Sequence, residues 1–202
     1  SDVCSSDLWT AGLAEVIKYG VIADESFFAY LEQSMDRLLK LDMEPVSRAI
    51  VRSCEIKAEV VGKDEREADL RRILNYGHTI GHALELLGNY RRWIHGEAVA
   101  MGMVQEADLA RHLDLCAPEV VERLRTLVRR AGLPDAMPPC TFANLWKAMQ
   151  HDKKTVQGRV HCVFPERIGR VVIKPLEQDD CRRWCQSLPS RRADKSARRA
   201  RA

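Results

Sequence analysis

Residues 75–97 read NYGHTIGHALELLGNYRRWIHGE and contain three of the six histidines of the chain. His78 and His82 are four residues apart, so a helix places both imidazoles on one face. A turn predicted at residues 88–89 separates this helix from a second one that begins at His95. Two imidazoles on one helix and a third a short loop away are typical of a divalent-metal site.

The spacing of these histidines does not identify the residue that completes the site. Glu15, Glu85 and Glu97 are all candidates, because zinc accepts mixed nitrogen and carboxylate ligands and leaves a position open for substrate in catalytic sites. The motif is not the HExxH of zinc proteases, since Thr79 stands where the general-base glutamate would be. A metalloprotease is therefore disfavoured.

The charge of the chain is concentrated at its C-terminal end. The chain has 202 residues, 46% of them hydrophobic, and a formal net charge of +3, which is enough material for one substantial core. Residues 190–202 read SRRADKSARRARA, with six basic residues against Asp194 alone. These residues therefore carry a net charge of +5, which leaves −2 for residues 1–189. We expect a disordered basic tail, and a near-neutral body argues against a nucleic-acid partner.

Cysteine usage and hydropathy predict the compartment. The seven cysteines form no CxxC pair and are odd in number, which favours reduced thiols over a disulfide framework. No apolar run approaches the roughly 20 residues that span a membrane. The sequence therefore predicts a cytoplasmic protein without a membrane segment. Residues 1–8, SDVCSSDL, fit no periodicity, and we expect them to be a foreign leader ahead of the domain at 9–189.

Helical periodicity dominates the body of the chain, which predicts a mainly α fold with one small late β-hairpin. Glu15 and Lys18 are three residues apart on the first helix, a spacing typical of a surface ion pair, and Lys57 looks solvated. The many Gly and Ala residues after His95 predict a close helix–helix approach. The expected elements are helices from Trp9, from Asp24 to Lys40, from Pro45 to Gly62, around 78–87, from His95, over 118–131, after Thr141 and over 177–187, with strands at 159–165 and 169–175 flanking residues 166–168.

Four segments carry a family resemblance. They are GLAEVIKYG (12–20), LRRILNYGHTIGHALE (70–85), HGEAVAMGM (95–103) and DKK (152–154). In this order they resemble 3-dehydroquinate synthase, and the resemblance runs collinearly from about Trp9 to Pro175. It matches the C-terminal, mostly helical domain of that family.

The resemblance implies a set of site residues. The metal ligands of the family fall on Glu15, His78 and His95, which replaces the ion-pair interpretation of Glu15. His82 then belongs to the substrate side, as a hydrogen-bonding or proton-relay residue.

The same resemblance implies residues that hold the substrate. Lys57 and Arg71 match residues that bind its carboxylate, and Lys18, Asn75 and Lys153 match residues that bind its phosphate and nearby hydroxyls.

The family converts 3-deoxy-D-arabino-heptulosonate 7-phosphate into 3-dehydroquinate and phosphate, a lyase reaction of the shikimate pathway toward chorismate and the aromatic amino acids. The resemblance implies zinc or cobalt as the metal, NAD⁺ as cofactor of the complete enzyme, and a homodimer. Family members carry an NAD-binding domain ahead of this one, and residues 1–8 do not match it. We therefore expect a truncated chain that binds metal weakly and does not turn over alone.

Three other functions compete with this one. Another sugar phosphate cyclase would share the metal triad, but Lys57 and Arg71 favour an acid substrate. A metal-dependent polyol dehydrogenase would not need so many phosphate-binding lysines. The third is a helical module with a structural zinc. Loss of a structural zinc would unfold the domain, whereas loss of a catalytic metal would leave its helices nearly intact.

Overall fold

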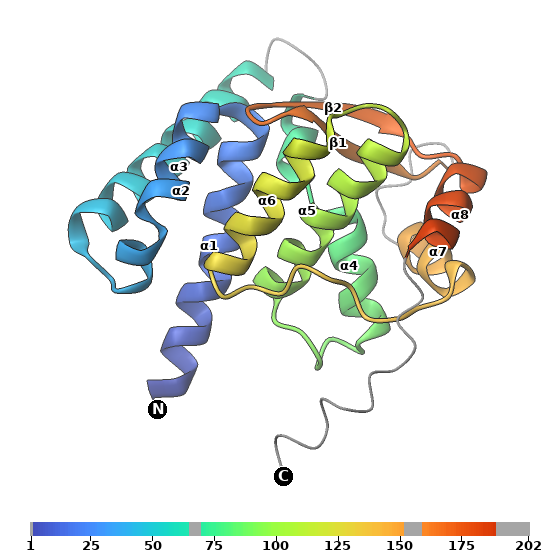
Figure 1. Cartoon of the computed structure of the whole chain (residues 1–202), viewed down its shortest axis with the longest axis horizontal. Coiled ribbons are helices and arrows are strands. Elements are labelled where there is room, and N and C mark those ends of the chain that lie inside the picture. The colour runs from blue at the N-terminus through green and yellow to red at the C-terminus, as the bar shows by residue number, and fades with distance from the viewer. Residues whose placement is uncertain (1, 65–69, 152–158, 189–202) are drawn as a thin grey trace.

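The computed structural model describes residues 2–64, 70–151 and 159–188. Figure 1 shows a body of helices with one two-stranded hairpin lying across its top. In chain order the elements of these ranges are α1 (Asp2–Ala23), α2 (Glu25–Leu39), α3 (Met43–Asp64), the 3₁₀ helix η1 (Leu70–Asn75), α4 (His78–Leu87), α5 (His95–His112), α6 (Pro118–Arg130), α7 (Phe142–His151), β1 (His161–Arg167), β2 (Arg170–Pro175) and α8 (Gln178–Ser187). The predicted mainly α fold with one late hairpin is confirmed. Within the described ranges, no helix combines the length and apolar character needed to cross a membrane.

Helix α5 is the central element, with α1, α4, α6 and β1 packed around it (Figure 1). Thirteen of its 18 residues are buried, as expected for a helix that is covered on all sides. A Cβ on Gly102 would lie 2.0 Å from the carbonyl oxygen of Gly77, so the α5 backbone touches the segment that leads into α4. The close approach predicted from the Gly and Ala content is thus present.

Two hydrophobic clusters meet at α5. The first joins α1, α2, α3 and α6, and the second joins α4, α7, α8 and β1. The largest fully buried side chains of the first include Tyr76, Phe28, Ile17 and Leu31, and those of the second include Trp184, Phe164, Ile80 and Leu84. Because α5 contributes to both clusters, it holds the two halves of the body as one unit.

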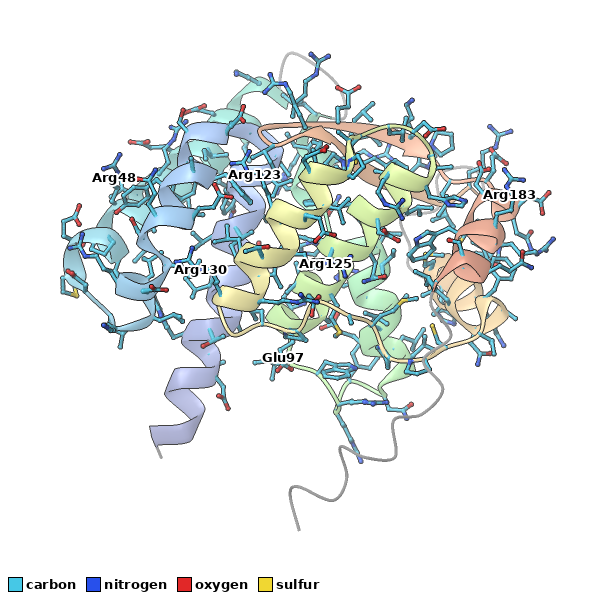
Figure 2. All side chains as sticks on the ribbon, viewed as in Figure 1. Arg48, Glu97, Arg123, Arg125, Arg130 and Arg183 are labelled. Atoms are coloured by element: carbon cyan, nitrogen blue, oxygen red, sulfur yellow. The ribbon has the colours of Figure 1, made fainter. Side chains whose placement is uncertain are left out.

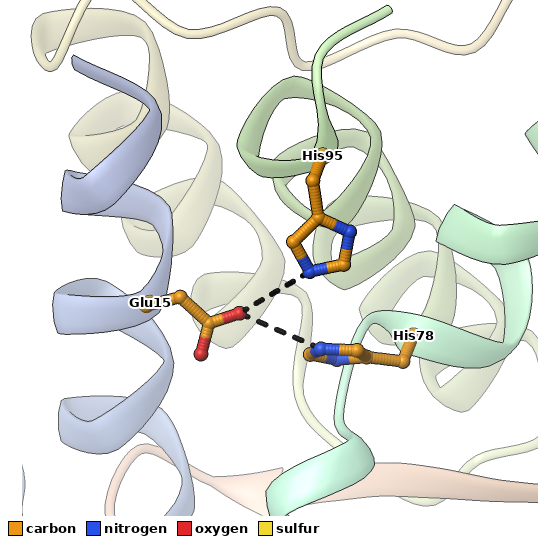
Figure 3. A group of neighbouring side chains, drawn as sticks. All are labelled: Glu15, His78 and His95. Carbon is orange, nitrogen blue, oxygen red and sulfur yellow. Dashed lines mark ion pairs between the residues drawn. The ribbon is translucent and has the colours of Figure 1, made fainter. Parts of the chain in front are cut away.

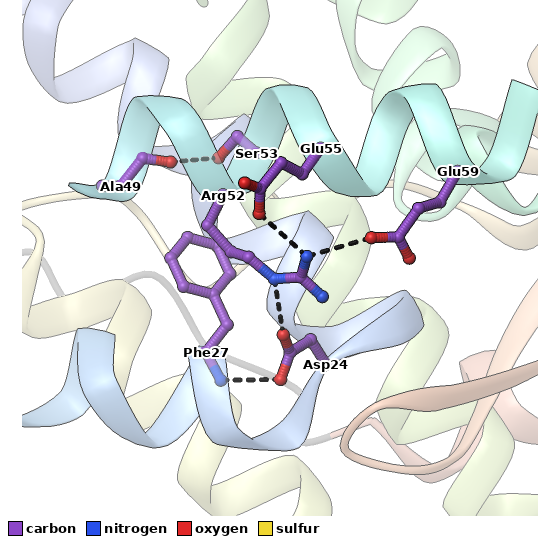
Figure 4. A network of polar contacts seen from close by, with 7 residues as sticks. All are labelled: Asp24, Phe27, Ala49, Arg52, Ser53, Glu55 and Glu59. Atoms are coloured by element: carbon purple, nitrogen blue, oxygen red, sulfur yellow. Dashed lines mark hydrogen bonds and ion pairs between the residues drawn. The ribbon is translucent and has the colours of Figure 1, made fainter. Parts of the chain in front are cut away.

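The junction of α1 and α2 is fixed by a polar network around Asp24 (Figure 4). Asp24 caps α2 as predicted, because its Oδ1 accepts a hydrogen bond from the backbone N–H of Phe27 at 2.9 Å. Its Oδ2 accepts a second bond, at 2.8 Å, from Arg52 of α3, which also pairs with Glu55 and Glu59 at 3.0 Å each. This network attaches α3 to the start of α2.

Helix α6 is tied to α2 by two arginines on its outer side. Figure 2 labels Arg123 and Arg130 where α6 faces α2. Arg123 pairs with the carboxylate of Glu32 at 2.8 Å, and Nη1 of Arg130 donates to the backbone carbonyl of Glu32 at 2.6 Å. Exposed pairs of this kind contribute about 0–1 kcal/mol each, so apolar burial is the main source of stability here.

Several boundaries differ from those predicted. Helix α3 runs from Met43 to Asp64 rather than from Pro45 to Gly62, because a single glycine costs a helix only about 1 kcal/mol and does not have to end it. Helix α1 begins at Asp2 rather than Trp9, because an existing helix extends by one backbone hydrogen bond per added residue. The foreign origin of residues 1–8 stays a prediction. Strand β1 includes Arg167, so the turn is shorter than predicted, and the N–H of Gly169 donates to the carbonyl of Val21 at 2.9 Å. The hairpin tip therefore rests on the end of α1. The predicted disordered tail lies outside the described residues.

Candidate metal and substrate site

Three residues far apart in the sequence meet where α1, α4 and α5 come together (Figure 3). Glu15 lies midway along α1, while His78 and His95 are the first residues of α4 and α5. One oxygen of Glu15, Oε1, is 3.5 Å from Nε2 of His78 and 3.9 Å from Nε2 of His95. The ligand atoms of all three lie within 4.8 Å of one another. The structure therefore brings together the three residues that the family resemblance selects.

The donor set fits a divalent ion such as zinc. Two ligands of a tetrahedral zinc ion with bonds of about 2.1 Å are about 3.4 Å apart. The distances from Oε1 of Glu15 to His78 and His95, 3.5 Å and 3.9 Å, are close to this value. One carboxylate and two imidazoles are also a common catalytic ligand set, which leaves a coordination position for substrate.

The start of α4 is held by a buried carboxylate. Glu106 of α5 accepts hydrogen bonds from the backbone N–H groups of Gly77, at 2.8 Å, and Ile80, at 3.2 Å. Gly77 has φ of +79°, a conformation that favours glycine, and it places His78 at the first helical position. In the sequence Glu106 follows the apolar run 98–104 of α5, and no role was predicted for it.

Lys18 sets the electrostatics of the cluster. Its Nζ lies 2.5 Å from Oε2 of Glu15, and its side chain is only 5% exposed, so the predicted ion pair forms but is not on the surface. Burial raises the pKa of the Glu15 carboxyl, but the charge and hydrogen bond of Lys18, together with His78 and His95, outweigh it and lower the pKa overall. Glu15 is therefore ionised at neutral pH.

His78 is neutral at the same pH. Burial lowers the pKa of its imidazole to about 4, with a further contribution from the charge of Lys18, and the bond to Tyr76 and the charge of Glu15 only partly oppose this. Nδ1 of His78 lies 3.0 Å from the carbonyl oxygen of Tyr76. Since a carbonyl only accepts, Nδ1 carries the proton and the lone pair of Nε2 faces Glu15. The ring is thus prepared as a ligand.

The other candidate carboxylates have different places. Glu85 lies on the far side of His95, 3.1 Å from its Nδ1, and forms a second possible metal-binding group with His82 and His95. Glu97 instead accepts a hydrogen bond from the N–H of Ile94 at 3.1 Å, at the start of α5. Of the three glutamates left open by spacing, only Glu15 joins both His78 and His95 within the described residues.

Of the residues expected on the substrate side, His82 lies beside this cluster. The ring centroid of His82 is 5.4 Å from that of His78. Asn75 is the last residue of η1 and precedes the first residue of α4, His78, by three positions. Lys57 on α3 and Arg71 on η1 are both exposed, and these two elements pack against each other. Lys153 and its neighbours in the DKK segment lie outside the described residues.

Comparison with known proteins decides the family. Residues 12–155 match a family model described as 3-dehydroquinate synthase C-terminal. The chain belongs to the 3-dehydroquinate synthase family. The 3-dehydroquinate synthase of Caldanaerobacter subterraneus subsp. tengcongensis is 47% identical over 84% of this chain, and that of Thermodesulfovibrio yellowstonii is 48% identical over 81%. The chain spans about half the length of these relatives, 48% and 46% respectively.

Solved structures of related cyclases share the fold of this 3-dehydroquinate synthase family member. A 2-epi-5-epi-valiolone synthase from Streptomyces hygroscopicus subsp. jinggangensis, with NAD⁺ and Zn²⁺ bound, matches with a TM-score of 0.78 and 25% identity, over 89% of this chain and 51% of that one. A 2-deoxy-scyllo-inosose synthase complexed with carbaglucose-6-phosphate, NAD⁺ and Co²⁺ gives a TM-score of 0.75 and 21% identity, over 89% and 52%. The family predicted from the four sequence segments is confirmed.

Proposed function

We propose that this chain is the metal- and substrate-binding half of a 3-dehydroquinate synthase. The proposed reaction is the lyase step of the shikimate pathway, in which 3-deoxy-D-arabino-heptulosonate 7-phosphate loses phosphate and closes to 3-dehydroquinate. The observation that carries the proposal is the convergence of Glu15, His78 and His95 in a chain whose relatives at 47–48% identity are 3-dehydroquinate synthases.

Glu15, His78 and His95 would hold the divalent ion, zinc or cobalt, that accompanies this fold in two solved cyclases. When bound, such an ion acidifies a substrate hydroxyl and stabilises the negative charge that develops beside it. The chain prepares these ligands without it, since Glu15 is ionised and His78 is neutral at physiological pH. We assign NAD⁺ to the half of the enzyme that this chain does not match.

The substrate carries negative charge at two ends, and both ends need cationic donors. We assign the carboxylate to Lys57 and Arg71, because the family resemblance selects both and both are exposed on elements that pack against each other. We assign the phosphate and nearby hydroxyls to Lys18, Asn75 and Lys153. Holding both ends would set the geometry in which the carbocycle closes.

His82 is the proposed proton-moving residue. It lies one helical turn after His78, and its ring centroid is 6.0 Å from that of His95. This position lets it reach a substrate group at the metal cluster without being needed as a ligand.

The complete enzyme is proposed to be a cytoplasmic homodimer. The six cysteines whose side chains the structure describes are all free, which suits a reducing compartment. The runner-up function is another sugar phosphate cyclase, which the two solved cyclases favour. Lys57 and Arg71 argue against it, since a neutral sugar phosphate has no carboxylate to pair with them.

A hybrid enzyme tests the proposal. The part of the Caldanaerobacter 3-dehydroquinate synthase that this chain does not match is fused to this chain. Phosphate release by the fusion is measured with the heptulosonate phosphate, NAD⁺ and Zn²⁺ or Co²⁺. We expect turnover that falls by about 100-fold or more in His95→Ala, because the ligand set is broken, while helicity persists. His112→Ala, at the other end of α5, is the matched control and should remain active.

Two results would contradict the proposal. Turnover of a neutral sugar phosphate but not of the heptulosonate phosphate would make the chain part of a different cyclase. Steady phosphate release by the 202-residue chain alone would show that the other half is not required.

A further inference from the structure

We infer that Glu85 is a positioning residue for His95: its carboxylate fixes which ring nitrogen of that histidine faces the metal. The inference rests on the proposed function, because it concerns the ligand set of the same site. It begins with one contact, in which Nδ1 of His95 lies 3.1 Å from Oε1 of Glu85. The opposite ring nitrogen, Nε2, is the one that faces Glu15.

The place of Glu85 follows from helical geometry. His78, His82 and Glu85 are spaced four and three residues apart on α4, so all three side chains lie on one face of the helix. The side chain of Glu85 is only 14% exposed, so surrounding residues restrict its movement. A single face of α4 thus supplies the proposed ligand His78 and, two turns later, the group that holds His95.

The chemistry of the contact determines the tautomer of His95. An ionised carboxylate has no proton to donate, so the hydrogen bond requires that Nδ1 of His95 carry the proton and donate it. In the neutral ring Nε2 then has the free lone pair, and this atom points toward Glu15. A carboxylate hydrogen-bonded to a ligating imidazole also makes that imidazole a stronger donor to the metal.

His95 needs this support more than His78 does. The side chain of His78 is 13% exposed and its Nδ1 is held by the rigid backbone carbonyl of Tyr76. The side chain of His95 is 51% exposed and begins its helix, so packing restricts its ring far less. Glu85 is therefore the group that restricts the ring of His95.

The same atoms suggest one competing role, in which Glu85 is itself a ligand. His82, Glu85 and His95 form a second possible metal-binding group, and the nitrogen of His95 that lies beside Glu85 is Nδ1, at 3.1 Å. A metal bound by Nδ1 would require this atom to lose the proton that it donates to Glu85. The two roles predict different stoichiometries, because the positioning role needs one ion per chain and the ligand role adds a second.

Metal binding by the 202-residue chain tests the inference without any turnover. Co²⁺ and Zn²⁺ are titrated against a chromophoric chelator for wild type, Glu85→Ala and Glu85→Gln. We expect the Kd to rise by about 10- to 100-fold in Glu85→Ala, and less in Glu85→Gln, whose amide oxygen can still accept the bond from Nδ1. Glu97→Gln is the matched control, since it removes the same charge two residues from His95 without touching its ring.

A second readout does not depend on the folding of any variant. Nitrogen NMR of the metal-free wild-type chain, with labelled histidine, should place the proton of His95 on Nδ1.

Circular dichroism checks that each variant keeps its helices. The inference is overturned by a Glu85→Ala Kd equal to that of wild type, by a proton on Nε2, or by a second ion that Glu85→Ala loses. Absence of metal binding by the wild-type chain would instead reject the proposed metal site.

Discussion

Replacing Gly96 with alanine should separate the helices that carry two of the proposed ligands. Gly96 follows His95 in the first turn of α5, where a Cβ would lie 2.2 Å from the carbonyl oxygen of Ala11 and 2.6 Å from its Cα. Since real Cβ contacts are essentially never under 3.0 Å and the facing atoms are backbone, α1 and α5 must move apart by roughly 1 Å.

That displacement falls directly on the proposed metal site. Ala11 is one helical turn before Glu15, so the gap between Glu15 and His95, now 3.9 Å, widens with it. Metal–ligand distances tolerate only about 0.2 Å of change. We therefore expect Gly96→Ala to weaken metal binding by about tenfold or more.

The variant should also be less stable without metal. Overpacking of a close contact costs about 1–3 kcal/mol, and each kcal/mol lowers the Tm by about 2–4 °C in a chain of this size. Gly12→Ala is the control on α1, because a Cβ there meets nothing within 4 Å and alanine favours the helix. A Gly96→Ala chain with the Tm and metal affinity of wild type would refute the reasoning.

Two further predictions concern the polar groups that position the helices. Asp24→Ala removes the α2 cap and the partner of Arg52, and should cost about 1–2 kcal/mol in urea unfolding. Burial raises the pKa of the Asp24 carboxyl, but the Phe27 N–H and Arg52 lower it overall below the ordinary value of 3.8. The stabilisation by ionised Asp24 is therefore complete above pH 3.8 and is lost as the pH falls through the lowered pKa. Equal stability of wild type and variant at pH 7 would contradict this. Glu106→Ala leaves the N–H groups of Gly77 and Ile80 without their acceptor, and should lower the free energy of unfolding by about 1–3 kcal/mol and weaken metal binding. An unchanged free energy of unfolding and an unchanged metal affinity would count against this prediction.

Local sequence signals predicted most of the fold. The Asp24 cap, the Pro118 start of α6 and the change from helical to strand periodicity near residue 160 all depend on neighbours within one turn or one strand. The start of α1 was predicted late because the sequence of residues 2–8 fits no helical periodicity. The hairpin turn was predicted one residue too long, since β1 ends at Arg167 and β2 begins at Arg170.

The site required information that local spacing does not contain. Spacing correctly placed His78 and His82 on one face of a helix, but it could not show that α1 packs beside the start of α5 and brings Glu15 to His95. Only the family resemblance selected Glu15 over Glu85 and Glu97. The role of Glu106 depends on the contact between α4 and α5, which no spacing rule predicts.

Anomalous diffraction from crystals of this chain grown with Co²⁺ or Zn²⁺ is the most direct test of the proposed metal centre. The account predicts one peak, about 2.0–2.2 Å from the Glu15 carboxylate and from Nε2 of both His78 and His95. A peak bound by His82 and Glu85 instead, or no peak between α1, α4 and α5, would contradict it.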